Sequence, residues 1–260
     1  MRKPIKVALI TEDDPFHLAE ALNYFLAQLP KEYDVKFAAV LKYVYTKRES
    51  LQTQIRPVEF IQVFGLLPSL RCLWRILTGR IKKSKKISQV LKNYAIPMKT
   101  GICDINSTEI LQLLKQEEPD LLIAIGVNSI FKKHLLELPN MGCINVHTGI
   151  KPEHRGRASM FWALADGDEE TGITVHYIDE HIDSGHVIKT NKYKIKERSF
   201  DLVSRDLRFL GVQTLLEGLH LLKEEQIPQS PTRPKQKTKT RPFPKREDLQ
   251  LFIKRGNRIF

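Results

Sequence analysis

Residues 141–156, MGCINVHTGIKPEHRG, contain a short apolar run that carries two polar side chains near its end. Apolar residues alternate there with Asn145 and His147, and a strand places alternate residues on the same face. Pro152 and Gly156 then end regular structure and begin a loop. Ligands of open parallel sheets bind where the strands end. The segment therefore predicts either a site built on an amide and an imidazole or two core polar groups bonded to the backbone.

The flanking sequence shows the alternation of strands and helices that is typical of a parallel α/β sheet. Residues 6–10 (KVALI) predict a buried strand, and Asp14 with Pro15 predicts an N-cap and first turn of a helix. Residues 33–41 return as a strand, and 120–126 (DLLIAIG) form the clearest buried strand of the chain. Strand, helix and strand in this order predict a Rossmann-like, open and mostly parallel sheet. The first turn lacks a G-x-G-x-x-G sequence, so a dinucleotide is not indicated.

The remaining periodic segments extend this pattern. They predict strands at 96–98, 171–178 and 186–194, and helices at 107–116, 158–166 and 199–225. Gly126 to Phe131 is expected to turn from a strand into a helix, and its exposed backbone groups could read a flat heterocycle. We expect residues 1–226 to form one domain, with a basic helical insertion at 42–95 and a basic extension at 227–260 that is extended or partly mobile.

Composition limits the class of protein. The 260 residues, 42% of them hydrophobic, suffice for one large domain with an appendage, and no apolar run reaches the ~18 residues of a membrane span. The N-terminus reads as a first strand rather than a signal peptide, because acidic residues interrupt its apolar run. Cys72, Cys103 and Cys143 show no metal-ligand spacing, so we expect reduced thiols and a cytoplasmic location.

The net charge of +12 favours anionic partners. Positive charge concentrates at 71–99 and 233–258. Neither region interleaves the aromatic residues of a base-stacking surface, which favours a solvated surface over a nucleic-acid interface.

The insertion contains an amphipathic basic helix. Residues 58–64 fit a strand or part of a helix, and 66–78 follow with a stripe of leucines and Trp74 beside Arg71 and Arg75. Packing on the domain is the ordinary explanation of such a stripe. Contact with a membrane surface or a lipid-linked substrate is the alternative.

Three segments converge on one chemistry. Asn145 and His147 lie at one strand end, His176 on a second strand, and Asp183 in the acidic loop that follows. On these residues the chain resembles the folate-dependent formyltransferase family, which includes glycinamide ribonucleotide formyltransferase, the N-terminal domain of methionyl-tRNA formyltransferase and the sugar N-formyltransferases. The resemblance rests on the Asn-x-His strand end and on 167–188, and it covers about 96–225 well and 5–41 weakly.

The resemblance implies roles for individual residues. Asn145, His147 and Asp183 fall on the catalytic positions, and the implied co-substrate is 10-formyltetrahydrofolate, with no metal. The residues implied in binding the folate are Gly126, Val127, Asn128, Ser129, Ile130, His176, Asp179 and Glu180. Lys151 and Arg155 make the loop after His147 more basic than is usual in the family, which suits an anionic group on the acceptor.

The same residues also allow other interpretations. His154, His176, His181 and His186 have no standard metal-ligand spacing, and no G-x-S-x-G marks a serine hydrolase. A purely structural network of Asn145, His147 and Asp183 remains an alternative. So do hydrolysis of the formylfolate and an inactive protein that binds anions or nucleic acid through its basic surface.

The acceptor is the least constrained element. The family's common Ser-Leu-Leu-Pro is replaced here by Thr148 to Pro152, and the sequence ends before the C-terminal barrel of the methionyl-tRNA enzyme. We therefore expect an amino sugar carried on a nucleotide or lipid first, initiator methionyl-tRNA second and glycinamide ribonucleotide third.

Overall fold

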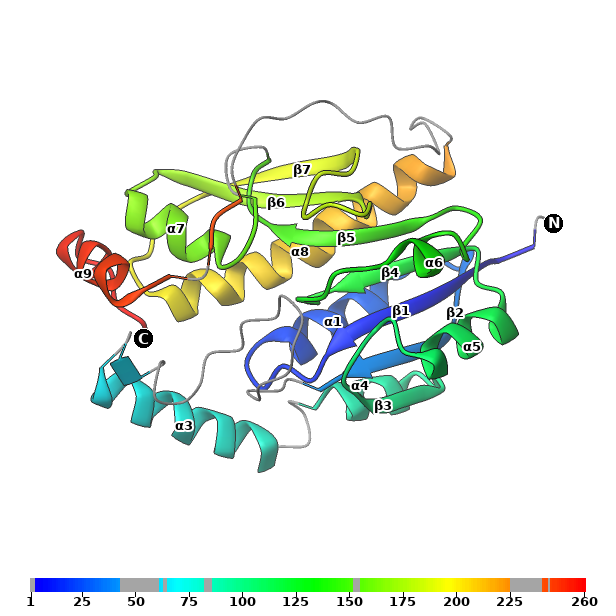
Figure 1. The fold of residues 1–260 in the computed structure, drawn as a ribbon, viewed down its shortest axis with the longest axis horizontal. Helices are drawn as coiled ribbons and strands as arrows, with labels where there is room; N and C mark the ends of the chain where they lie inside the picture. The colour runs from blue at the N-terminus through cyan, green and yellow to red at the C-terminus, as the bar shows by residue number, and fades with distance from the viewer. Residues whose placement is uncertain are drawn as a thin grey trace.

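A seven-stranded sheet forms the centre of the molecule (Figure 1), with strand order β3-β2-β1-β4-β5-β6-β7. The computed structural model describes residues 3–42, 61–62, 65–81, 86–151, 155–224, 240–242 and 244–260. The strands are β1 (Ile5–Glu12), β2 (Tyr33–Leu41), β3 (Met98–Ile102), β4 (Leu121–Ile125), β5 (Cys143–Thr148), β6 (Glu170–Tyr177) and β7 (Val187–Lys194). The pairs among β1 to β5 are all parallel, whereas β6 pairs antiparallel with both β5 and β7. The predicted open, mostly parallel sheet is confirmed.

Helices cover both faces of the sheet. One core contains α1 (Leu18–Gln28), α4 (Ile87–Asn93) and α8 (Phe200–Lys223), and the other contains α5 (Thr108–Glu117) and α6 (Lys133–Leu136). Because successive residues of a strand point to opposite faces, Ile123 belongs to the first core and Leu122 to the second. Every residue of β4 is buried, as expected of a central parallel strand.

Helix α8 packs closely beneath the strands that carry the predicted site. Ser199 caps its N-terminus by accepting a hydrogen bond from the Leu202 amide at 3.3 Å. A Cβ at Gly211 would lie 3.1 Å from Val146 Cγ1, so the glycine lets the helix approach β5. This close packing against α8 helps to hold β5 in position.

Three local predictions are wrong. Asp14 is not an N-cap: it accepts from the Phe16 amide and pairs with Arg208 at 3.0 Å, so α1 begins only at Leu18. The edge strand lies at 98–102 rather than 96–98, because Pro97 only accepts, from Ala38, and the pairing with β2 begins at Met98. Residues 126–132 form an irregular loop with Gly126 at φ +68°, and α6 begins at Lys133.

The C-terminal segment is also more ordered than expected. Residues 246–254 form α9 (Arg246–Lys254), which packs on α7 (Ser159–Asp166). Phe252 is fully buried and stacks on Phe161 with ring centroids 4.9 Å apart. The expectation of an extended tail therefore fails for 244–260, because this segment supplies an apolar face to α7, while residues 225–239 lie outside the described part.

Helix α3 (Leu66–Ile81) confirms the predicted amphipathic helix but not its packing. Its leucines and Trp74 are exposed rather than buried against the domain. Of the segment 58–64, only Ile61 and Gln62 are described, and both are helical. Within the described part of the chain, Cys72, Cys103 and Cys143 form no disulfide.

Candidate active site

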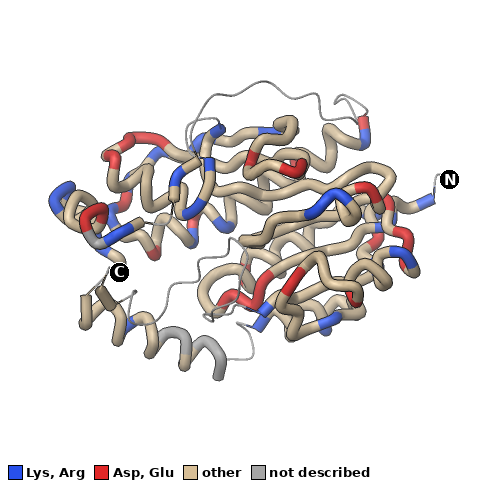
Figure 2. Tube along the Cα trace, viewed as in Figure 1, with Lys and Arg blue, Asp and Glu red and all other residues tan. Residues whose placement is uncertain are grey.

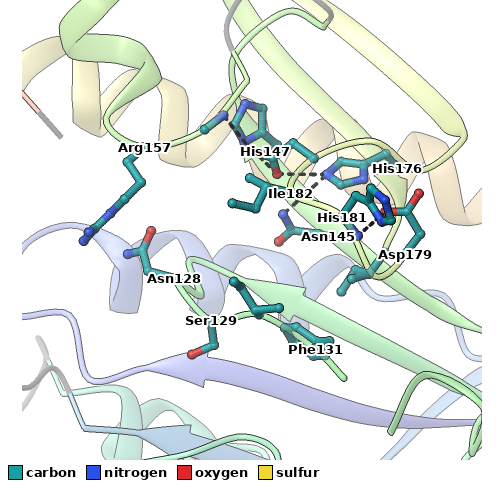
Figure 3. A pocket seen from close by; sticks show the side chains of 14 residues that line it. Asn128, Ser129, Phe131, Asn145, His147, Arg157, His176, Asp179, His181 and Ile182 are labelled. Carbon is teal, nitrogen blue, oxygen red and sulfur yellow. Dashed lines mark hydrogen bonds and ion pairs between the residues drawn. The ribbon is translucent and has the colours of Figure 1, made fainter. Parts of the chain in front are cut away.

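A pocket opens where β4 and β5 end, beside the loop that joins β6 to β7 (Figure 3). Chain segments after three strands line it, which is the usual place for a ligand in an open sheet. The lining residues are Asn128, Ser129, Ile130, Phe131, Asn145, His147, Gly156, Arg157, His176, Ile178, Asp179, His181, Ile182 and Asp183.

Strand pairing brings the amide and the two imidazoles together. Asn145 lies directly opposite His176 across the antiparallel β5–β6 pair, and His147 lies two residues further along the same face. The Asn145 Nδ2 atom is 3.5 Å from His176 Nε2, and the His147 and His176 ring centroids are 6.2 Å apart. The shared face predicted from the alternation of residues is present.

Asp183 reaches this cluster from the β6–β7 loop. Its φ of +46° is in the left-handed region, which is uncommon for a residue with a side chain. Its Oδ1 atom lies 3.5 Å from His147 Nδ1 and 3.6 Å from His176 Nε2, and its Oδ2 atom accepts from the Gly156 amide at 2.9 Å. The Ser184 hydroxyl donates to both Asp179 carboxylate oxygens, which holds the loop that presents Asp183.

The hydrogen bonds of His176 define its tautomer. His176 Nδ1 lies 2.7 Å from the Tyr177 carbonyl oxygen, so Nδ1 carries the proton. Burial lowers the pKa of His176 below its ordinary value, more than the neighbouring Asp183 carboxylate raises it. A neutral ring therefore directs an Nε2 lone pair at the Asn145 amide, which leaves the second Nδ2 hydrogen of Asn145 for a ligand.

Asp183 is held ionised by its surroundings. Burial raises the pKa of the carboxyl group, but the electrostatic influence of His147, the contact with His176 and the Gly156 hydrogen bond together outweigh burial. The pKa of Asp183 consequently lies well below its usual range. The carboxylate is thus suited to stabilising positive charge beside it, rather than to acting as a strong base.

The 126–132 loop is fastened at both ends by side chains from other elements. Glu12, at the end of β1, accepts from the Asn128 amide at 2.7 Å. Asn106 donates to the Ile130 carbonyl at 2.9 Å and accepts from the Lys132 amide at 2.8 Å. The loop therefore presents a fixed set of backbone groups to the pocket.

Arg155 plays a different part from the one predicted. Its side chain is buried, and its guanidinium donates to the Ile182 carbonyl at 2.6 Å, so it braces the Asp183 loop instead of facing an acceptor. Its carbonyl accepts from the Arg241 amide at 2.8 Å, and the Arg157 amide donates to the Arg241 carbonyl at 3.0 Å. The C-terminal segment thus pairs with the very backbone whose Gly156 amide holds Asp183.

The side chain of Arg241 fastens this segment to α7. Its guanidinium pairs with Asp166 and lies 4.8 Å from the centroid of the Trp162 ring, and the Trp162 indole donates to the Pro242 carbonyl at 2.9 Å. We call residues 240–242 the C-terminal strap.

Lys151 lies near the pocket without lining it. Its Nζ atom is buried and has no hydrogen-bond partner among the described residues. Burial lowers the pKa of Lys151 to about 7, although Asp183 acts to raise it. A buried amine in this condition is suited to an anionic ligand that would supply the missing partner.

Eight predicted site residues meet in the pocket: Asn128, Ser129, Ile130, Asn145, His147, His176, Asp179 and Asp183. Five others are described but do not line it: Gly126, Val127, Lys151, Arg155 and Glu180. Sequence reasoning missed Glu12, Asn106, Arg157 and Arg241, although the acidic Glu12 at the end of an apolar strand was a usable signal.

Comparison with known proteins supports the family. A family model described as formyl transferase matches residues 80–219. A methionyl-tRNA formyltransferase of Kosmotoga olearia is 32% identical over 185 residues, which cover 70% of this chain and 59% of that protein. One from Clostridioides difficile is 34% identical over 121 residues, covering 46% of this chain and 39% of that protein. The chain thus spans about half the length of these curated relatives.

Solved structures support the fold. A phosphoribosylglycinamide formyltransferase of Anaplasma phagocytophilum has a TM-score of 0.59 at 14% identity and covers 87% of this chain and 90% of that one. A sugar N-formyltransferase of a Shewanella species has a TM-score of 0.54 at 15% identity, covering 91% of this chain and 75% of that one. At such identities the likeness concerns the fold alone.

Proposed function

The chain belongs to the formyl transferase family, and from that premise we propose that it transfers a formyl group from 10-formyltetrahydrofolate to a primary amine. The observation that carries the proposal is the meeting of Asn145, His147, His176 and Asp183 in one pocket beside a fixed backbone loop. Such a cluster supplies hydrogen-bond donors and a carboxylate without a covalent nucleophile.

The pocket has the chemistry of a folate site. Ile130, Phe131, Ile178 and Ile182 provide apolar surface, and the 128–131 backbone lies beside them (Figure 3). A flat heterocycle with donors and acceptors on its edge needs this combination. When bound, the folate would supply a formyl carbon attached to a nitrogen leaving group.

In this proposal, Asn145 and His147 stabilise the formyl oxygen. When an amine adds to the formyl carbon, negative charge develops on that oxygen, and N–H donors from an amide and an imidazole stabilise it. Each such donor is worth on the order of 10²–10³ in rate. The contact of His176 with Asn145 fixes the amide before the substrate arrives.

Asp183 completes the electrostatics of the transfer. One C–N bond forms and another breaks, so a proton must leave the acceptor nitrogen and reach the departing nitrogen. An ionised Asp183, whose Oδ1 atom lies 3.5 Å from His147 Nδ1, stabilises the positive charge that develops on the attacking amine. Electrostatic stabilisation of this kind contributes a factor on the order of 10²–10³ in rate.

We propose an anionic amine as acceptor, with a nucleotide- or lipid-linked amino sugar as first choice. Arg157 lines the pocket and Lys151 holds a buried, unpartnered amine nearby, and both suit a phosphate group. Initiator methionyl-tRNA and glycinamide ribonucleotide are the alternatives, the first because the sequence relatives cited above carry that name.

An acceptor panel tests the proposal. Purified protein is supplied with 10-formyltetrahydrofolate and, separately, nucleotide-linked amino sugars, initiator methionyl-tRNA and glycinamide ribonucleotide, and both formylated product and free formate are measured. Asn145→Ala and Asp183→Asn should each lower kcat by about 10²-fold or more. Surface variants Asn93→Ala and Asp34→Asn serve as matched controls, since Asn93 is exposed and the Asp34 side chain is 45% exposed.

The outcomes separate the alternatives. Product with one acceptor identifies the acceptor class, and formate release without an amine would indicate hydrolysis of the folate. If either site variant turned over normally while the protein formylated an amine, the assigned mechanism would be wrong.

A further inference from the structure

Helix α3 exposes one continuous apolar face. Six large side chains on it are between 51% and 79% exposed, namely Leu66, Leu67, Leu70, Leu73, Trp74 and Leu77. At 3.6 residues per turn, these positions fall within an arc of about 120°. The small residue Cys72 is instead the buried one. The helix therefore turns its largest apolar side chains away from the protein, at a site that the proposed reaction does not use.

The sequence around this face carries only positive charge. Between residues 65 and 86 there are seven basic residues and no acidic one: Arg71, Arg75, Arg80, Lys82, Lys83, Lys85 and Lys86. Figure 2 likewise shows no acidic segment on α3, whereas acidic segments occur on the sheet side of the molecule. The exposed Arg71 lies 5.2 Å from the ring centroid of Phe260, which links the helix to the C-terminal end of the chain.

We propose that α3 docks the protein on an anionic lipid bilayer. Leucines and a tryptophan on one face of a helix, in a stretch of sequence whose charged residues are all arginines and lysines, are typical of a helix that lies in the membrane interface. A basic cluster adds electrostatic attraction to anionic headgroups. A face for a second copy of the chain would instead bring two clusters of like charge together, which opposes association.

The helix would lie on the membrane rather than cross it. No helix in the described part of the chain is long and apolar enough to span a bilayer. Interfacial helices bury their apolar face about 5–10 Å into the headgroup region and leave the polar face in water. Docking through α3 is thus compatible with a folded sheet that stays outside the bilayer.

Trp74 gives a direct spectroscopic test with the full chain. The protein has two tryptophans, of which Trp74 is 65% exposed and Trp162 only 5%. Vesicles of phosphatidylcholine alone and vesicles with about 30% phosphatidylglycerol are added, and emission and co-sedimentation are measured. We expect a blue shift and sedimentation with the anionic vesicles only, weakened by salt. Trp74→Phe should lose the shift.

A matched pair of variants locates the contact. Leu70→Glu with Leu73→Glu should lower the vesicle-bound fraction by about tenfold or more, since it places two charges in the apolar face. The control, Leu251→Glu with Ile253→Glu, changes two exposed apolar residues of α9 and should bind as the wild type does. All four residues are exposed, so the melting temperatures should change little.

Three results would overturn the proposal. They are the absence of binding to anionic vesicles at low salt, unchanged binding of the Leu70/Leu73 variant, and a wild-type dimer in light scattering that the Leu70/Leu73 variant dissociates, which would assign the face to a second copy. The vesicle assay needs no turnover. A failure here therefore leaves the proposed reaction untouched, and inactivity towards every amine leaves the docking result standing.

Discussion

Asp183 combines a left-handed backbone conformation with a buried, ionised side chain. Aspartate tolerates this conformation better than most residues, and strained positions of this kind cluster at functional sites. The conformation turns the carboxylate towards His147, His176 and the Gly156 amide at the same time. Replacement by asparagine keeps the shape and removes only the charge.

Because the pKa of Asp183 is lowered, the free energy of unfolding should depend on pH in the acidic range. Folding favours the ionised carboxyl, so its contribution is present above the unfolded pKa of about 3.9 and is lost as the pH falls below it. Asp183→Asn should therefore lower the melting temperature at pH 7 and flatten its decline below about pH 5. Thermal unfolding across pH checks this, with Asp34→Asn as the exposed control. A variant that retained the wild-type acid dependence would contradict it.

The buried Lys151 amine lowers the free energy of unfolding, and we expect it to bind an anionic ligand. Its folded pKa of about 7 lies below the ordinary lysine pKa of 10.5, so the folded state resists a proton that the unfolded chain accepts. The resulting penalty is complete below about pH 7 and disappears as the pH rises to about 10.5. We expect Lys151→Met to raise the melting temperature at pH 6–7, with no gain near pH 10.5.

The same variant should bind the acceptor less well. Loss of the buried amine removes a partner for an anionic group, so KM for the acceptor should rise about tenfold or more while kcat changes little. Lys115→Met, an exposed helix position, is the control. A destabilised variant with normal KM would mean that Lys151 is structural.

At the scale of elements, the C-terminal strap and residues 155–157 form one unit. Gly156 has φ +101°, and a Cβ there would lie 2.6 Å from the Arg241 carbonyl oxygen. Only glycine allows the strap to pair with residues 155–157 while the Gly156 amide faces Asp183. The strap therefore holds the backbone segment whose Gly156 amide donates to the Asp183 carboxylate.

Arg241→Ala should loosen this unit. It removes the pairing with Asp166 and the contact with Trp162, so the Gly156 hydrogen bond that lowers the pKa of Asp183 should weaken. We expect kcat to fall by about tenfold and the acid limb of the pH–rate profile to move to higher pH. Arg205→Ala, which removes another Arg–Asp pair on α8, should leave both unchanged. An unshifted profile in Arg241→Ala would reduce the strap to a stabilising role.

Site residues whose placement depends on local strand alternation could be predicted from the sequence, whereas contacts between distant elements could not. Asn145, His147 and His176 were found because strand alternation is a local property, and their convergence follows from one antiparallel pair. The contact of Glu12 with Asn128 spans 116 positions and depends on β1 lying beside β4, which the pattern of strands does not fix. Arg155 was misassigned for a related reason, since its charge predicted an anion but its partner is the Ile182 carbonyl.

At the scale of the whole molecule, the C-terminal helix joins the fold through one small core. Leu249 and Phe252 of α9 pack with Phe161, Trp162, Leu164 and Ala165 of α7. A nine-residue helix is marginal alone, so α9 is held by this burial and by the hydrogen bonds that residues 257–259 make with Leu164 and with residues 198–201. Helix α7 begins at Ser159, shortly after Gly156, whose amide donates to Asp183. Detachment of α9 from α7 should therefore also change the geometry of the site.

Phe252→Ala tests that coupling. The side chain is fully buried, so its truncation should cost about 3–5 kcal/mol of unfolding free energy. Denaturant unfolding should be followed by Trp162 fluorescence in a Trp74→Phe background, since the Trp162 indole bonds the Pro242 carbonyl and reports the strap. Leu251→Ala, an exposed neighbour, should cost less than about 1 kcal/mol.

The number of unfolding transitions in Phe252→Ala shows whether α9 unfolds together with the sheet or before it. One cooperative transition at lower denaturant would mean that α9 unfolds with the sheet, and activity below the transition should then remain near normal. A separate early change in Trp162 emission, accompanied by loss of activity before the sheet unfolds, would mean that α9 and the strap detach as a unit. The second outcome is the one we expect, because α9 contacts α7 through a small core separate from the two faces of the sheet. A loss of less than 1 kcal/mol with unchanged activity would contradict both the packing energy and the coupling.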